Sequence, residues 1–282
     1  MISISSVKKQ FQKKLINIFP ISEILAIWRR WVVKEILKKT FLDSILDEDK
    51  TISNKENKKI NLLIEHLLSN QPVQYFFGYS YFKNLKFYIN DSVLIPRPET
   101  EELVDLVIKE SIKKLPNCII DIGTGSGCIA IVLKKKIKSK MIALDISESA
   151  LSQASKNAHN HDVDIEFNKI DILSLDDYQL LPKIDYIVSN PPYVTRSEIS
   201  RNSIIHSEPH NAIFVPDKHP LIFYESILRL ANRNLNIGGK IFFEINPKFV
   251  SELVNMIKNY RFFNIEIHKD FFGKKRFIIV SS

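Results

Sequence analysis

Cysteine is nearly absent from this sequence, which has 2 cysteines in 282 residues. Cys118 and Cys128 have no metal-ligand spacing with any histidine, and so small a number excludes a disulfide framework. We therefore expect both to lie in the core, and we expect no bound metal. The chain also lacks any run of about 18 apolar residues, so no membrane span is predicted. Its first residues are polar and contain no apolar signal segment, which predicts a cytoplasmic protein.

Glycine is scarce as well, with only 7 residues in the whole chain, well below the usual frequency of about 7%. Three of these glycines, Gly123, Gly125 and Gly127, nevertheless alternate within one short stretch. Clustering from so small a supply indicates a backbone that needs φ > 0 or a close approach to a ligand.

The remaining composition is that of a globular protein, with 45% hydrophobic and 26% charged residues. A chain of 282 residues can bury one good core and is long enough for two units. The net charge of +8 has two interpretations. A nucleic-acid or ribosome-associated partner would suit it, but lysine, isoleucine and asparagine are abundant throughout, as in proteins from AT-rich genomes. We follow the second interpretation and expect a monomer without stable nucleic-acid binding.

Three segments of different character divide the chain. Residues 1–72 predict a small helical bundle, because apolar residues recur at the spacing of a helix face. Trp28 and Trp31 fall on such a face and are expected in the core. Residues 73–93 turn to short aromatic strands and should form a β-hairpin linker. Residues 94–282 then carry the motifs that suggest a function.

Strand and helix patterns alternate through the third segment. Thr100 follows Pro96 and Pro98 and is expected to cap the first of its helices. Such alternation predicts an α/β fold with a doubly wound, mostly parallel, seven-stranded sheet and right-handed crossovers. A short turn joins the last two strands, so that pair should be antiparallel. The expected strands cover residues 118–122, 141–144, 165–167, 184–188, 240–245, 263–268 and 276–280.

The clustered glycines belong to Asp121-Ile122-Gly123-Thr124-Gly125-Ser126-Gly127, at the end of the first expected strand. A glycine-rich turn between a strand and a helix is a weak signal alone, because dinucleotide enzymes share it. Their fingerprint needs glycine or alanine at position 128, where this chain has Cys128. Asp121 would repel a pyrophosphate but attract a cationic centre, such as the ammonium or sulfonium of S-adenosylmethionine. The stretch therefore predicts a binding loop for that cofactor.

Acidic residues follow the next two expected strands. Asp145 is placed to accept two ribose hydroxyls, as an acid does in nucleotide sites generally. Asp171 could accept from the adenine amino group, with Ile172 covering the ring. The alternative for both acids is an ordinary helix cap or turn residue.

A second motif, Ser189-Asn190-Pro191-Pro192-Tyr193, follows the expected strand at residues 184–188. A planar NH2 group, on adenine, cytosine or a glutamine amide, is a poor nucleophile because its lone pair is delocalised. The Asn190 side-chain carbonyl and the Pro191 backbone carbonyl can each accept one N–H and direct that lone pair at a methyl carbon. Pro191 and Pro192 stiffen the loop, so alignment costs little entropy. Tyr193 offers a flat face to the acceptor; the alternative is a tight proline turn.

Both motifs together resemble the class I S-adenosylmethionine-dependent methyltransferases that modify exocyclic or amide nitrogen, which have a Rossmann-like fold. Further segments narrow the resemblance to the peptide chain release factor N5-glutamine methyltransferases, the PrmC/HemK family, and extend it almost end to end. Those segments are Pro72-Val73-Gln74-Tyr75 with Gly78, residues 94–104, and Glu208-Pro209 with Ala212.

The resemblance implies N5-methylation of the glutamine in the Gly-Gly-Gln loop of bacterial class-one release factors, which act in translation termination. It also implies that the glycine loop, Asp145 and Asn190 contact the cofactor, and that residues 190–193 hold the glutamine as the catalytic residues. The helical bundle is then expected to dock the substrate. Two segments depart from the family pattern, residues 214–219 in place of a glycine-rich turn and residues 246–248 in place of a glycine.

Other functions stay open on the sequence. The same four-residue loop serves DNA and RNA adenine-N6 methyltransferases, although this chain has no spare domain large enough to recognise a flipped base. A methyltransferase for a ribosomal-protein glutamine shares the loop too. From other classes, the chain could be a binding module that retains a cofactor fold, or a hydride-transfer enzyme that binds NAD.

Overall fold

The computed structural model describes residues 2–174, 181–200 and 203–282. These residues form two compact units, Met1–Gly78 and Tyr79–Ser282. The boundary falls after Gly78, so the hairpin that the sequence set apart as a linker belongs to the larger unit. Within the described ranges, no helix is both long and apolar enough to cross a membrane.

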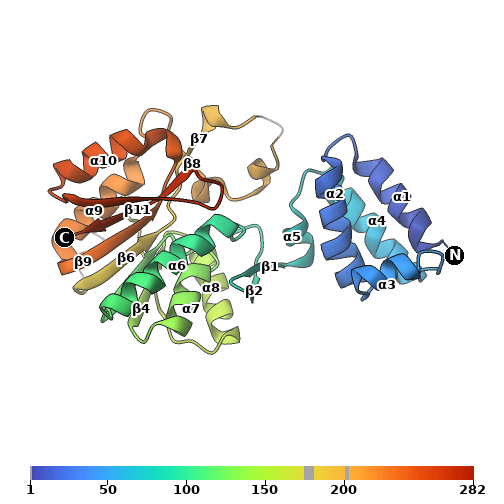
Figure 1. Ribbon diagram of the computed structural model, residues 1–282, viewed down its shortest axis with the longest axis horizontal. Helices are drawn as coiled ribbons and strands as arrows, with labels where there is room; N and C mark the ends of the chain where they lie inside the picture. Colours follow the sequence, from blue (N-terminus) through green and yellow to red (C-terminus); the bar gives the residue numbers. More distant parts are fainter. Residues whose placement is uncertain (1, 175–180, 201–202) are drawn as a thin grey trace. The chain divides into compact units, whose positions relative to one another are not determined.

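The smaller unit is helical, as predicted (Figure 1). Its helices are α1 (Ile4–Leu15), α2 (Ile21–Ile27), the π-helical η1 (Trp28–Ile36), α3 (Phe41–Leu46), α4 (Asn54–Leu68) and α5 (Val73–Phe77). Ser53 and Glu56 form a capping box at the start of α4. Trp28 and Trp31 are buried, and Trp28 meets Phe11 edge to face at a centroid distance of 5.5 Å. Both tryptophans therefore serve the core, as expected.

A seven-stranded, mostly parallel sheet organises the larger unit, as the alternating pattern predicted. Its strands are β3 (Cys118–Ile122), β4 (Lys140–Asp145), β5 (Glu166–Lys169), β6 (Ile184–Ser189), β9 (Leu235–Glu244), β10 (Asn264–Lys269) and β11 (Lys275–Ser281). They lie in the order β10-β11-β9-β6-β3-β4-β5. The strands from β9 to β5 run parallel, whereas β11 pairs antiparallel with both β9 and β10.

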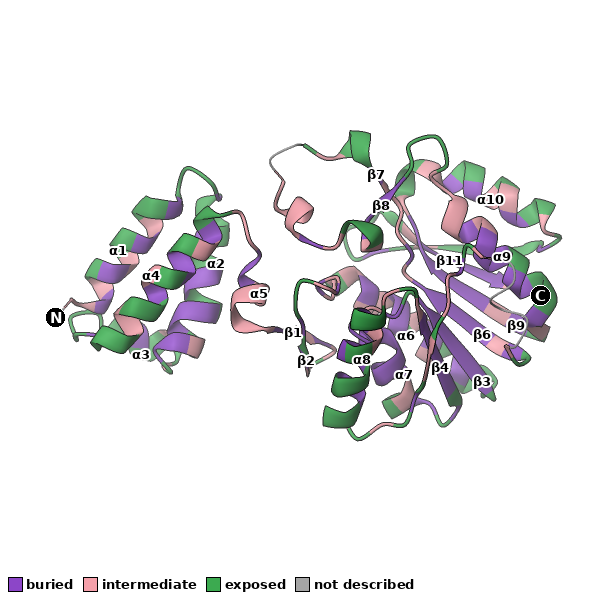
Figure 2. Ribbon diagram, turned by 180° about the vertical axis from the view of Figure 1, so that it is seen from behind, coloured by how far each residue is buried: buried purple, intermediate pink, exposed green. Residues whose placement is uncertain are grey.

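Side chains alternate along the strands between two cores. In β3, Ile120 and Ile122 face one core and Ile119 faces the other. The helices around the sheet are α6 (Pro98–Lys113), α7 (Cys128–Lys136), α8 (Glu148–Asn160), α9 (Ile222–Asn234) and α10 (Val250–Asn259). The first core packs against α9 and α10, and the second against α6, α7 and α8. Figure 2 shows the strands buried and these helices exposed on their outer faces.

The hairpin of β1 (Tyr79–Phe82) and β2 (Leu85–Tyr88) is bound to the sheet unit. Its Phe82 and Phe87 are fully buried in the second core. The buried Asn157 of α8 accepts the N–H of Tyr88, and its Nδ2 donates to the carbonyls of Tyr88 and Ser126, all at 2.9 Å. Asn157 thus links the hairpin to the glycine loop.

The connection between β6 and α9 contains structure that the sequence did not predict. The short strands β7 (Val194–Thr195) and β8 (Phe214–Val215) pair in parallel. Between these two strands lie the 3₁₀ turns η2 (Arg196–Glu198), η3 (Ile204–Ser207) and η4 (His210–Ala212). A further 3₁₀ turn, η5 (Pro247–Phe249), follows β9.

Candidate active site

The two motif loops begin beside each other at the carboxyl edge of the sheet. β3 and β6 are neighbouring parallel strands, and their last residues, Ile122 and Ser189, stand in register. The Ser189 hydroxyl donates to the Ile122 carbonyl at 2.8 Å. The chain runs from β3 outward to β4 and β5 and returns at β6, so the loops flank the point where the strand order reverses. Ligands of doubly wound sheets bind at such points.

All three glycines of the first loop have positive φ, at 76° for Gly123, 54° for Gly125 and 81° for Gly127. This confirms the backbone requirement inferred from their clustering. A Cβ added at Gly123 or Gly125 would meet no atom of the described residues within 4 Å, whereas one at Gly127 would come to 3.1 Å from Ala154 and from Ile131. The first two glycines therefore leave room for a ligand, and the third permits close packing of α7 against α8.

Asp121, the acid at the start of this loop, is fully buried. Its Oδ2 accepts the Thr124 hydroxyl at 2.7 Å. Its Oδ1 has no hydrogen-bond partner among the described residues. Burial raises the pKa of Asp121 to about 7, although the bond from Thr124 and the backbone N–H of Ala130 act in the opposite direction. Direct contact of this buried carboxylate with a cationic ligand group stays a prediction.

Asp145 ends β4 and holds the glycine loop through its carboxylate. Its Oδ2 accepts the N–H of Gly125 and its Oδ1 accepts the N–H of Ser147, both at 2.9 Å. Burial raises the pKa of Asp145, and these backbone donors oppose that shift. Each carboxylate oxygen keeps a further lone pair, so the side chain can still accept hydroxyl donors from a ligand.

Asp171 and Ile172 follow β5, the strand beside β4. The Oδ1 of Asp171 accepts the N–H of Leu173 at 2.9 Å, which makes Asp171 a turn residue. Ile172 is 8% exposed and packs in the core under α9 and α10. The carbonyl of Asp145 accepts the N–H of Ile170 at 3.1 Å and keeps this segment close. Adenine contacts from Asp171 and Ile172 stay a prediction.

Two residues of the second loop are each held by a side chain from another element. The Nδ2 of Asn190 donates to Oγ1 of Thr100 at 3.0 Å, and the Tyr193 hydroxyl donates to Oε1 of Glu244 at 2.9 Å. The Thr100 hydroxyl in turn donates to Oε2 of Glu244 at 2.7 Å. The prediction that Thr100 caps its helix is wrong, because α6 begins earlier and Arg97 occupies the cap position.

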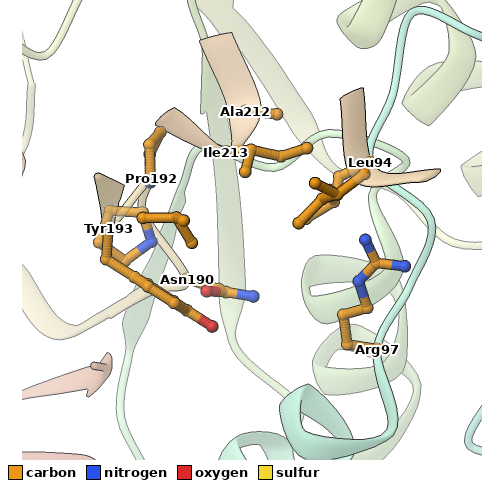
Figure 3. A pocket seen from close by; sticks show the side chains of 10 residues that line it. Leu94, Arg97, Asn190, Pro192, Tyr193, Ala212 and Ile213 are labelled. Atoms are coloured by element: carbon orange, nitrogen blue, oxygen red, sulfur yellow. The ribbon is translucent and has the colours of Figure 1, made fainter. Parts of the chain in front are cut away.

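A small pocket of about 60 Å³ lies beside the second loop. Figure 3 shows Asn190 between Tyr193 and Arg97, with Leu94 and Ile213 also directed toward the pocket. The other residues that line it are Pro191, Pro192, Val194, Ile205 and Ala212. An apolar cavity with a few placed polar groups is typical of a site that orients a small planar side chain.

An ion pair joins two of the segments that carry the family resemblance. The Arg97 guanidinium pairs with Oε1 of Glu208, whose side chain is 3% exposed. The N–H of Ile95 donates to Oε2 of the same carboxylate at 3.1 Å. Although Arg97 and Glu208 are 111 residues apart in sequence, the pair brings both segments to the same pocket wall.

The departures from the family pattern lie against the second loop. The Nδ2 of Asn246 donates to the Tyr193 carbonyl at 3.1 Å and to Oε2 of Glu198 at 3.1 Å. Phe214 and Val215 form β8, which pairs with the strand directly after that loop. Both departures therefore supply contacts that fix the loop.

Thr100 and Glu244 are site residues that the sequence did not identify. One sequence feature could have indicated Glu244: it is an acid directly after the apolar run of residues 241–243 in an expected strand. A charge at a buried strand position requires partners. Thr100 left no signal of its own, because a threonine in a first helical turn is ordinary.

Comparison with known proteins defines the class. Residues 102–208 match the family model "Methyltransferase small domain". A methyltransferase from Pyrococcus furiosus shares the fold with a TM-score of 0.52 at 16% identity, over 80% of this chain and 98% of that one. A Thermus thermophilus 16S rRNA methyltransferase does so with a TM-score of 0.53 at 13% identity, over 72% and 49%. The fold, the paired loops and the matched region define a methyltransferase.

Relatives much closer in sequence show the family. A release factor glutamine methyltransferase of Flavobacterium psychrophilum is 41% identical over 99% of this chain and 99% of its own length. Another, of Bacteroides thetaiotaomicron, is 39% identical over 95% and 96%. This chain belongs to the release factor glutamine methyltransferase family, as the resemblance indicated.

Proposed function

We propose that this chain transfers a methyl group from S-adenosylmethionine to N5, the side-chain amide nitrogen, of the glutamine in the Gly-Gly-Gln motif of class-one release factors. Family membership supports the substrate. The observation that carries the chemistry is the registration of Ile122 with Ser189, which starts both loops at one edge of the sheet. Ligands held by the two loops would share that edge, as a direct transfer requires.

The first loop fits this cofactor. When bound, S-adenosylmethionine supplies an electrophilic methyl group on a cationic sulfur. An ionised Asp121 at the start of the loop would attract a cationic group, and the open space over Gly123 and Gly125 allows close approach. Asp145 can accept ribose hydroxyls with its remaining lone pairs. The proposed cofactor contacts are Asp121, Gly123, Thr124, Gly125, Ser126, Gly127, Asp145, Asp171, Ile172 and Asn190.

The second loop orients the acceptor. The Oδ1 of Asn190 and the carbonyl of Pro191 each accept one N–H of the glutamine amide, which turns the nitrogen lone pair toward the donor. Pro192 limits movement of the loop, and the Tyr193 ring bounds the planar amide. Burial and the nearby Glu244 raise the pKa of Tyr193 well above its usual value, so its hydroxyl is a hydrogen-bond donor rather than a base. The transfer would form the C–N bond as the S–C bond breaks, would leave a neutral thioether, and would release one proton of the NH2 group to solvent. Such a displacement needs neither a metal nor a covalent intermediate.

The N-terminal unit, Met1–Gly78, is assigned the docking of the release factor. The Flavobacterium psychrophilum relative matches 99% of this chain, including that unit. Hydrogen exchange of the chain with and without release factor tests the assignment. Slower exchange within residues 2–78 of the complex supports it, and exchange unchanged throughout that range contradicts it.

Incubation with methyl-labelled cofactor separates the proposal from its rivals. Release factor, ribosomal protein, DNA and RNA are offered in parallel reactions. Label on the release factor is the expected result. Label on DNA or RNA alone would identify an adenine methyltransferase, and label on ribosomal protein alone would identify the related glutamine methyltransferase.

A further inference from the structure

A buried carboxylate lies behind the second loop without touching the pocket. Glu244, the last residue of β9, is 1% exposed. It accepts two hydroxyl protons, from Thr100 at 2.7 Å and from Tyr193 at 2.9 Å. Its backbone carbonyl accepts a third, from Tyr224 at 2.9 Å. These bonds satisfy the buried carboxylate, and two of their donors, Thr100 and Tyr193, are a partner of Asn190 and a member of the second loop.

The direction of the hydrogen bonds fixes how Asn190 can point. A threonine hydroxyl has one proton to donate, and Thr100 donates it to Oε2 of Glu244 at 2.7 Å. The Oγ1 of Thr100 can then act only as an acceptor toward Asn190. It must therefore face the NH2 end of the Asn190 amide, at 3.0 Å, which leaves Oδ1 turned away from Thr100.

We propose that Glu244 and Thr100 are positioning residues that set the orientation of the Asn190 side-chain amide, so that its carbonyl rather than its NH2 meets the acceptor. This inference rests on the proposed function, because it requires that the substrate present an N–H group to Asn190. With the amide reversed, Asn190 would present two donors to the donor hydrogens of the glutamine amide and would repel it. Glu244 holds Tyr193 at the same time and so couples both ends of the loop.

Burial raises the pKa of Glu244, and the Glu99 carboxylate adds to that rise. The bonds from Thr100 and Tyr193 and the Arg276 guanidinium act in the opposite direction. Tyr224 also faces Glu244, with its hydroxyl protonated because burial raises its pKa. Protonated Glu244 could donate to Thr100, which would free the Thr100 proton for Asn190 and allow the amide to turn.

Two substitutions at one position separate the hydroxyl from the packing. Thr100→Val keeps the shape and removes the hydroxyl that bonds both Asn190 and Glu244, and Thr100→Ser keeps the hydroxyl and removes a methyl group. We expect kcat for release factor methylation to fall roughly 100-fold in Thr100→Val and by no more than about threefold in Thr100→Ser. Affinity for S-adenosylmethionine should stay within about threefold of the unaltered chain in both. Ser111→Ala, at the other end of α6, removes a buried hydroxyl that donates to the Ile108 carbonyl at 2.7 Å and should leave kcat unchanged.

Side-chain amide NMR gives a readout that does not depend on turnover. The Asn190 NH2 signals, identified by their loss in Asn190→Ala, should exchange slowly with solvent in the unaltered chain and in Thr100→Ser, and faster in Thr100→Val. Equal kcat in Thr100→Val and the unaltered chain would overturn the inference, as would equal loss in Thr100→Val and Thr100→Ser. If Thr100→Val does not fold, fast exchange of the Asn190 NH2 in the unaltered chain overturns it. A chain that methylates no release factor refutes the proposed function, and the exchange rates then decide the orientation separately.

Discussion

The hydroxyl of Ser189 donates to the backbone carbonyl of Ile122 at 2.8 Å, across the last residues of two neighbouring parallel strands. Ile122 belongs to the glycine-loop motif, and Ser189 directly precedes Asn190 of the second loop. The first loop is proposed to hold the methyl donor and the second the methyl acceptor. The separation of the loops is therefore set by strand pairing and not by the loops themselves. Rigid elements of this kind are the usual support for reactive loops.

Replacing Asn190 by alanine should remove an oriented acceptor while leaving the cofactor loop intact. We expect kcat to fall roughly 100- to 1000-fold, the range for loss of one placed hydrogen-bonding group, with S-adenosylmethionine affinity changed by no more than about threefold. Steady-state methylation and calorimetric titration measure the two quantities. Asn264→Ala, on the exposed face of β10, is the matched control and should behave as the unaltered chain. An unchanged rate in Asn190→Ala would contradict the role given to Asn190.

Cofactor affinity should rise with pH. Burial raises the pKa of Asp121 to about 7, above its usual range, so in the free chain the carboxyl is neutral at pH 6 and ionised at pH 8. A cationic ligand group prefers the ionised form, and binding near neutral pH should therefore release a proton. Single-group linkage gives roughly a tenfold weaker affinity at pH 6 than at pH 8. Titration calorimetry in buffers of different ionisation enthalpy measures both the affinity and the proton release.

The matched variant for that experiment is Asp121→Asn, which keeps the shape and removes the titration. It should bind S-adenosylmethionine more weakly than the unaltered chain at pH 8, with little dependence on pH between 6 and 8. Identical pH profiles for the two proteins would show that another group controls binding.

Gly127 should tolerate alanine less well than Gly273 does. Both glycines have nearly the same φ, 81° and 80°, so the backbone cost of about 1–2 kcal/mol applies to both. Only at Gly127 would the new Cβ press on neighbours, at 3.1 Å from Ala154 and Ile131, whereas Gly273 has nothing within 4 Å. We expect Gly127→Ala to lower the free energy of unfolding by about 1–3 kcal/mol more than Gly273→Ala. Denaturant titration compares them, and equal losses would argue against the packing role of Gly127.

The Arg97–Glu208 pair should matter more for stability than an exposed pair. Arg97→Leu leaves Glu208, 3% exposed, without its countercharge. We expect a loss of about 3 kcal/mol in the free energy of unfolding. Arg229→Leu breaks the ion pair between Arg229, 43% exposed, and Glu225, 37% exposed. It should lower the free energy of unfolding by no more than about 0.5 kcal/mol. Chemical denaturation of the two variants provides the comparison, and similar losses would contradict the account.

The elements with strong local signals were predictable from the sequence. Short apolar runs predicted the sheet strands, because a strand buried on both faces needs apolar side chains on each. Ile119 and Ile120, which face opposite cores, are an example. The clustering of Gly123, Gly125 and Gly127 predicted their positive φ, because this conformation depends on the individual residue and glycine adopts it readily.

Features that depend on distant partners were not predictable. Thr100 and Glu244 are 144 residues apart, and neither segment alone indicates that they meet. The strands β7 and β8 have only two residues each, too few for an alternating pattern. The π-helical stretch η1 carries the apolar spacing of an ordinary helix face, so the sequence could not distinguish the two.

The central claim is that the loop of residues 190–193 directs a glutamine amide nitrogen at a methyl group held over the glycine loop. Mass analysis of peptides from release factor, after reaction with this chain and S-adenosylmethionine, tests it most directly. The account predicts one added methyl group on the side-chain amide of the glutamine in Gly-Gly-Gln. A methyl group on any other residue, or a factor left unmodified by an active cofactor-bound chain, would contradict it.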